Sequence, residues 1–386
     1  MPQTLAVQHY QRNRHPQGTT ISATIGGFEV WFRGAHLDQA PERGDPFLAV
    51  ALIPAMFAGA DLDLRDLPPV SGQLLGSLEQ IQEIWTTWNP ELRRINVRAN
   101  IAPEERPVST RTGTFFSGGV DAVHAVVAGA GPGELLAFVN GFDFVMSDTD
   151  WDTATARAAR LADKLGGELT TLETNWISFT RHHRIARSTS HGGCLIAAAH
   201  LLAPARMTIA SSNSWLRITP WGTHNLLDPL WSTDLTALRH FGSDALRSEK
   251  VAAIAARPEL LDDLWVCHDD PVRNCGRCTK CSRTMAVLQV IGATSRGFAD
   301  TTGDPIDRYL RAVPRTWEKV YLGELRRTVV EHGADRDLLR RIDAADRALN
   351  RRVALRELRH LLLPPHRPGR GEVDLRPWGF GPVPES

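Results

Sequence analysis

The chain has 386 residues, of which 42% are hydrophobic, so it is long enough for two or three domains with buried cores. Its 44 basic and 44 acidic side chains give a formal net charge of zero, which argues against nucleic acid as a partner. No apolar run reaches the roughly 18–20 residues that span a bilayer, and no signal-peptide core precedes residue 18. We therefore expect a cytoplasmic protein with no membrane segment.

Residues 1–108 predict a mixed α/β N-terminal domain without a catalytic motif. The expected elements are a loose arm, a β-hairpin, two helices and a strand, over 1–18, 19–32, 45–56, 77–88 and 95–101. Asp45-Pro46 marks the start of the first helix, because Pro is favoured at the first helical position.

Residues 109–298 alternate between strand and helix patterns. The strands are expected at 114–116, 134–140, 168–173 and 206–211, with helices at 120–130, 151–165 and 193–202. This alternation predicts a Rossmann-like α/β fold, a parallel sheet with helices on both faces, whose ligands bind at the carboxyl ends of the strands. Residues 299–386 predict a helical C-terminal region followed by a Pro/Gly-rich tail.

The segment 115–122 reads Phe-Phe-Ser-Gly-Gly-Val-Asp-Ala, between a predicted strand and a predicted helix. Small residues before a helix let backbone N–H groups converge on an anion, and the helix adds its positive end. The pattern predicts a phosphate-binding loop; the alternative is an ordinary Gly-rich turn. The segment lacks the Gly-Lys-Ser/Thr ending of a Walker loop.

Four cysteines lie within fifteen residues, at Cys267, Cys275, Cys278 and Cys281. Two short Cys-x-x-Cys steps and one more distant thiolate can close a tetrahedron around Zn²⁺, with no position left open for catalysis. An iron–sulfur cluster and metal-free thiols are the alternatives. Cys194 lies in an apolar helix and is expected to be a core residue.

Two of these motifs together carry a family resemblance. Ser117–Asp121 resembles the pyrophosphate loop of the PP-loop ATP pyrophosphatases, Ser-Gly-Gly-x-Asp-Ser, except that Ala122 replaces the final Ser. With the Asn-Cys-Gly-x-Cys-x-x-Cys segment downstream, residues 110–295 are similar to the 7-cyano-7-deazaguanine synthase branch of that superfamily. The resemblance implies a fold of the adenine nucleotide alpha hydrolase type, and ATP cleavage that releases pyrophosphate and adenylates a substrate.

The resemblance also implies roles for individual residues. The residues expected to hold ATP are Ser117, Gly118, Gly119, Val120, Asp121 and Ser211. The residues expected to act in catalysis are Asp121, as the Mg²⁺ ligand, and Arg247 and Lys250, as cations that neutralise phosphate.

A Trp-rich segment is the expected substrate side. It contributes Trp215, Arg217, Trp221 and His224, and His191 is added from a Gly-rich turn. Arg can clamp a carboxylate and Trp can stack on a planar ring, although a loop closing over a core has the same composition. The stretch 211–231 departs from the deazaguanine pattern, which leaves the acid open.

These features predict an ATP-dependent ligase. Its partners would be a small-molecule carboxylate and an ammonia or amine donor, and the outcome an amide or a nitrile; a homodimer stays open. Two alternatives remain at this point: adenylation-dependent sulfur transfer to a nucleobase, with Cys194 as carrier, and a non-catalytic nucleotide-binding scaffold, suggested by Ala122.

Overall fold

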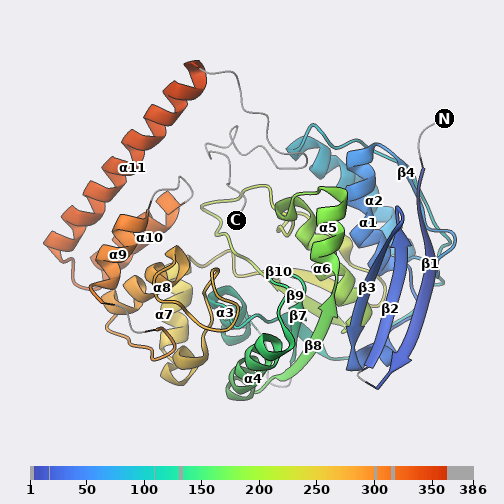
Figure 1. The fold of residues 1–386 in the computed structure, drawn as a ribbon, viewed down its shortest axis with the longest axis horizontal. Helices are drawn as coiled ribbons and strands as arrows, with labels where there is room; N and C mark the ends of the chain where they lie inside the picture. The colour runs from blue at the N-terminus through green and yellow to red at the C-terminus, as the bar shows by residue number, and fades with distance from the viewer. Residues whose placement is uncertain are drawn as a thin grey trace.

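The computed structural model describes residues 4–16, 18–107, 109–129, 134–299, 302–313 and 318–362, with side chains up to residue 355 (Figure 1). Its strands are β1 (Thr4–His15), β2 (Gly18–Ile25), β3 (Phe28–Gly34), β4 (Asp61–Asp63), β5 (Val97–Arg98), β6 (Thr112–Phe115), β7 (Leu135–Asn140), β8 (Glu168–Thr174), β9 (Arg206–Ala210) and β10 (Ala237–Phe241). Its helices are α1 (Asp45–Ala58), α2 (Gly72–Trp88), α3 (Val120–Gly129), α4 (Asp148–Leu165), α5 (Trp176–His183), α6 (Arg187–Leu202), α7 (Arg247–Ala255), α8 (Thr279–Val290), α9 (Pro305–Ala312), α10 (Glu318–Glu331) and α11 (Arg336–Leu362), with short 3-10 helices η1 (Ala35–Gln39), η2 (Asp228–Trp231) and η3 (Pro258–Asp263). None of the helices within these ranges has both the length and the apolar character needed to cross a membrane.

In the part of the chain that the structure describes, ten strands form one sheet in the order β10-β9-β6-β7-β8-β3-β2-β1-β4-β5. The five strands from β10 to β8 are all parallel, as the alternating pattern predicted. Numbered along the chain, they run 3-2-1-4-5 from β8 to β10, which matches five of the six strands in the Rossmann order 3-2-1-4-5-6. The strand order therefore reverses between β6 and β9, where ligands of such sheets bind.

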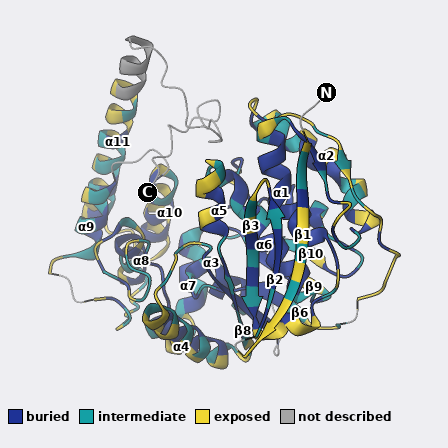
Figure 2. Cartoon of the chain, turned by 45° about the vertical axis from the view of Figure 1, so that its right-hand side comes forward, coloured by how far each residue is buried: buried dark blue, intermediate teal, exposed yellow. Residues whose placement is uncertain are grey.

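The sheet is covered on both faces, as expected for this fold class. Along β7, Leu136 and Phe138 belong to one hydrophobic cluster, with α3, α4 and α7, whereas Ala137 and Val139 belong to a second cluster, with α1 and α6. Successive side chains of a strand point to opposite faces, so this single strand is buried in both cores. Figure 2 shows the resulting buried layer between the helices.

Residues 4–107 extend the same sheet. The predicted hairpin is confirmed, because β2 and β3 are antiparallel, and β3 pairs with β8 at its other edge. The sheet is therefore continuous across the domain boundary that the sequence predicts near residue 108. The second cluster likewise draws residues from both sides of that position.

Two local predictions in this region are wrong. Residues 4–15 form the strand β1 rather than a loose arm. Its one fully buried side chain is Val7, so the strand has no regular apolar pattern. It is ordered because it pairs with β2 and β4. Only Val97–Arg98 of the strand expected over 95–101 forms a ladder, because β4, its partner, is just Asp61–Asp63.

The helices after residue 302 pack on the sheet domain through a buried polar cluster. Arg283 of α8 pairs with Glu318 of α10, with N–O distances of 3.2 and 3.3 Å, and Tyr309 donates to the same carboxylate at 2.9 Å. Glu318 is fully buried, so these partners offset the cost of taking its charge out of water. The predicted Pro/Gly-rich tail lies outside the described residues.

Candidate functional site

The loop between β6 and α3 lies at the reversal of strand order. Gly118 has a φ of +75°, a conformation that favours glycine, and the Gly119 N–H donates to Ser117 Oγ at 3.3 Å. The loop leads directly into α3, whose first turn carries Asp121. The predicted phosphate-binding loop thus lies where ligands of such sheets bind and leads directly into the N-terminus of a helix.

Two cations from α7 converge on Asp121. Arg247 Nη1 donates to Oδ2, and Lys250 Nζ donates to Oδ1 at 3.1 Å. Lys250 is only 2% exposed, and its Nζ also donates to the carbonyl of Ser211 at 2.6 Å, at the end of β9. The structure therefore brings together four residues expected to hold ATP or act in catalysis, from β9, α3 and α7.

Asp121 is held as a carboxylate by this arrangement. Burial raises its pKa, but the charges of Arg247 and Lys250 act in the opposite direction and leave the pKa below its ordinary value. Both carboxylate oxygens are engaged, so Asp121 positions two cations. A Mg²⁺ ion at this carboxylate, as the resemblance implies, would have to share its oxygens with both cations.

Ala122 belongs to the hydrophobic cluster beneath α3 and is 7% exposed. An apolar side chain therefore fits this position.

A hollow that carries cationic side chains, called here the cationic hollow, lies beside Arg247 and Lys250. It is lined by Ser212, Asn213, Ser214, Arg217, Ala245, Arg247, Lys250, Val320, Tyr321 and Glu324. Three of these residues come from α10, which sequence reasoning did not connect with the site because α10 carries no motif. Burial raises the pKa of Glu324, whose carboxylate accepts the Ser248 N–H at 3.3 Å. The C-terminal helices thus form one wall of the candidate site.

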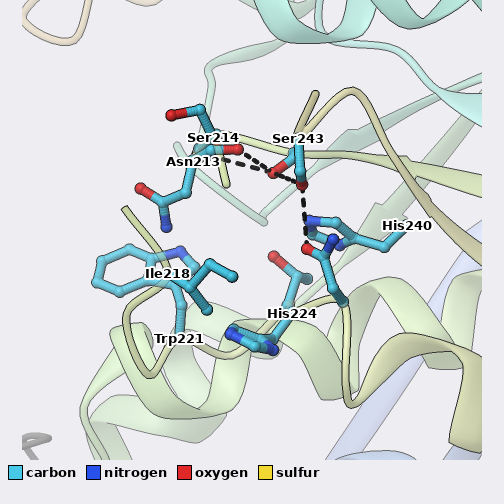
Figure 3. Close-up of a pocket in the computed structure, with 11 residues that line it drawn as sticks. Asn213, Ser214, Ile218, Trp221, His224, His240 and Ser243 are labelled. Atoms are coloured by element: carbon cyan, nitrogen blue, oxygen red, sulfur yellow. Dashed lines mark hydrogen bonds between the residues drawn. The ribbon is translucent and has the colours of Figure 1, made fainter. Parts of the chain in front are cut away.

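A second, polar hollow lies on the other side of the segment 212–214. It is lined by Ser211, Ser212, Asn213, Ser214, Ile218, Trp221, Thr223, His224, Asn225, His240 and Ser243. In Figure 3 the labelled side chains form a ring, with Trp221 and Ile218 on one side and His240 and Ser243 on the other. Trp221 and His224, both predicted to contact substrate, therefore lie in one hollow, and Arg217 in the other.

The other two predicted substrate residues line neither hollow. Trp215 is 56% exposed and lies at the surface. His191 packs behind Trp221, with ring centroids 5.3 Å apart, and its Nε2 lies 3.3 Å from Thr223 Oγ1. His191 thus supports the loop that carries Trp221, since Gly192 and Gly222 are so close that a Cβ on Gly192 would lie 1.8 Å from the Gly222 carbonyl oxygen.

His224 is uncharged near neutral pH. Burial and the neighbouring His240 lower its pKa to about 4, against the opposing effect of Asp228. Its Nδ1 accepts the N–H of Leu226 at 3.0 Å, which places the proton of the neutral ring on Nε2.

The four cysteines meet the requirements of a metal site. Their Sγ atoms all lie within 4.8 Å of one another, and Cys267 Sγ and Cys278 Sγ are 3.8 Å apart. A tetrahedral Zn²⁺ with bonds of about 2.3 Å separates its sulfur ligands by about 3.8 Å. The backbone N–H groups of Cys278 and Cys281 point at sulfur atoms, 3.3 and 3.4 Å away. The donor set and its spacing fit Zn²⁺.

A hydrogen-bonded segment connects the cysteine cluster with the predicted phosphate-binding loop. Asn274 Oδ1 accepts the N–H groups of Val266 and Cys267, at 2.8 and 3.2 Å, which fixes the strand-like segment before the first cysteine. In the same segment, the Trp265 N–H donates to the Gly118 carbonyl at 2.8 Å. Trp265, which contacts the Ser-Gly-Gly loop, is therefore only two residues before Cys267, the first member of the cysteine cluster.

Cys194 lies within α6 and is fully buried in the cluster with α1. Burial raises its pKa well above the ordinary thiol value, which disfavours the thiolate. The side chain is a core residue, as predicted.

No protein-family profile matches the chain, and no curated protein and no solved structure is significantly similar to it. The resemblance to PP-loop enzymes thus stays a prediction from the motif residues. The geometry of the two hollows and the loop is the basis on which a function can be assigned.

Proposed function

We propose that this chain binds Mg·ATP at the β6–α3 loop and adenylates a small-molecule carboxylic acid, releasing pyrophosphate. The adenylated acid is then attacked by ammonia or an amine, to give an amide and AMP, or a nitrile after a second adenylation. The fold would accordingly be of the adenine nucleotide alpha hydrolase type.

One observation carries this proposal: Arg247 and Lys250 converge on the first turn of the helix that follows the Ser-Gly-Gly loop. Two fixed cations beside the N-terminus of a helix suit the charge that develops on a departing pyrophosphate. Positioning and electrostatics are the chemical contribution that these two cations can make.

The polar hollow next to the cations supports the choice of an acid substrate. Arg217, in the cationic hollow, and Trp221, in the polar one, lie on either side of the segment 212–214. A planar acid can stack on the Trp while its carboxylate reaches toward the cations. The sulfur-transfer alternative loses its carrier, because Cys194 is buried.

Product analysis tests the proposal. Incubation with Mg·ATP and ring carboxylic acids (carboxylated 7-deazaguanine, nicotinate, benzoate) is expected to give AMP and pyrophosphate with at least one acid. Arg247→Gln should lower this rate by about 10²–10³-fold, because a cation aimed at developing charge is lost. The products are measured by anion-exchange chromatography.

Arg257→Gln is the matched control, since Arg257 lies just beyond the same helix, lines neither hollow, and contacts Glu259 and the Lys164 carbonyl instead. It should turn over as the wild type does. Release of ADP and phosphate, or no nucleotide turnover with any acid, would contradict the proposal; nucleotide binding without turnover would favour the scaffold alternative.

A further inference from the structure

The polar hollow contains a histidine held by a buried carboxylate. His240 Nδ1 lies 2.6 Å from Oδ2 of Asp228, which is fully buried. Oδ1 of the same carboxylate accepts the backbone N–H of His224 at 3.0 Å. Because Nδ1 donates to the carboxylate, Nε2 is the ring nitrogen of His240 that can accept a proton.

The strand β10 separates this histidine from the phosphate side of the site. Phe241 stacks with His124 of α3, with centroids 6.4 Å apart, whereas His240 faces η2 on the opposite side of the sheet. The two sides meet at the carboxyl edge, where Ser243 Oγ donates to Ser211 Oγ at 2.9 Å and the Ser211 carbonyl accepts Lys250. A substrate lying across the segment 211–214 would thus be within reach of both.

The two hollows differ in charge. The cationic hollow carries two arginines and a lysine against one glutamate, an excess of positive charge that suits phosphate. Among the described residues that line the polar hollow there is no lysine, arginine, aspartate or glutamate. An uncharged lining favours a neutral nucleophile over an ammonium ion, since it offers no opposite charge in place of water.

Attack by an amine requires a base in the polar hollow. A neutral amine that attacks a carbonyl carbon acquires positive charge on nitrogen and must lose a proton before a stable amide forms. A neutral imidazole oriented by a buried carboxylate is suited to take that proton, because the carboxylate stabilises the imidazolium that results.

We propose that His240 is the general base for ammonia or a primary amine, and that Asp228 is its positioning residue. The N–C bond forms, and the C–O bond between the acyl group and AMP breaks with its electron pair leaving on AMP. One proton moves from the attacking nitrogen to His240 Nε2. The inference rests on the proposed function, because it needs an adenylated acid.

His240→Gln separates the two half-reactions. With an acid that supports turnover in the wild type, exchange of labelled pyrophosphate into ATP should be unchanged. Amide formation from ammonium chloride should fall by about 10²–10⁴-fold. Hydroxylamine, a stronger nucleophile that is neutral at pH 7, should restore product as the hydroxamate. The exposed His36 provides the matched control, and His36→Gln should leave both half-reactions unchanged.

Asp228→Asn should give the same pattern, because an amide no longer selects the Nδ1–H tautomer of His240. A purely structural role would lower pyrophosphate exchange as well and would not respond to hydroxylamine. Unchanged amide formation in His240→Gln overturns the inference alone, and so does loss of both half-reactions. If the wild-type chain forms no AMP with any acid, the proposed function falls and this inference with it.

Discussion

Asp121→Asn is expected to lower the free energy of unfolding by about 3–5 kcal/mol, because it leaves the charges of Arg247 and Lys250 buried without their anion. It should also reduce adenylation by about 10²-fold or more, since both cations lose the group that positions them. Denaturant unfolding followed by circular dichroism measures the first effect, and pyrophosphate release measures the second.

The pH dependence of this loss has a definite sign. The pKa of Asp121 is lower in the folded chain than in the unfolded chain, because the effect of its two cations exceeds that of burial. Its contribution to stability is therefore complete above about pH 4, the ordinary value of an Asp, and is lost as the pH falls below it. The difference between wild type and Asp121→Asn should be constant near neutrality and shrink in acid.

Asp148→Asn is the matched control for this variant. Asp148 is also an aspartate in the first turn of a helix, but it is exposed. Removing its charge should cost only about 0.3–1 kcal/mol, the usual size of a helix-dipole interaction. An equal loss in the two variants would show that helix polarity, and not the buried cations, explains the role of Asp121.

Loss of the metal is expected to unfold the region around α8 and to inactivate the site. Structural Zn²⁺ contributes about 10–16 kcal/mol in small domains, which equals or exceeds the whole stability of most proteins. Cys278→Ser should therefore abolish the binding of about one zinc per chain and lower the midpoint of thermal unfolding. Because the segment from Trp265 to Cys267 also holds Gly118, nucleotide turnover should be lost with the metal.

Elemental analysis of the purified chain measures the metal directly. Cys194→Ala is the control, because that thiol lies in another core and should leave the zinc content unchanged. A brown protein that contains iron and sulfide would show that the cysteines hold an iron–sulfur cluster instead of zinc. Full zinc content in Cys278→Ser would remove that residue from the ligand set.

Local sequence determined much of the molecule. The helix expected over 151–165 ends as predicted before Gly166, which has a φ of 72°, although α4 begins three residues earlier, at Asp148. The spacing of the four cysteines likewise predicted a cluster whose sulfur atoms the fold brings within 4.8 Å of one another. These features depend on neighbours in the chain, which is why they could be predicted.

Other features depended on segments far apart. β1 has few apolar residues and forms because β2 and β4 supply its hydrogen bonds. The joining of β3 to β8, which makes one sheet of what the sequence divides at residue 108, is a pairing between residues about 140 positions apart. No local pattern encodes such a pairing.

The candidate site also combines features that local sequence predicts with features that only tertiary contacts decide. Sequence alone identified Asp121, Arg247 and Lys250 as a candidate set, and tertiary structure decided that Asp121 anchors the other two. It also decided that α10 walls the cationic hollow and that His240 meets Asp228, twelve residues earlier, across a strand and a 3-10 helix. The physical reason is that residue types determine which chemical groups are present. The distances between these groups, their burial and their charge balance arise only when the chain is folded.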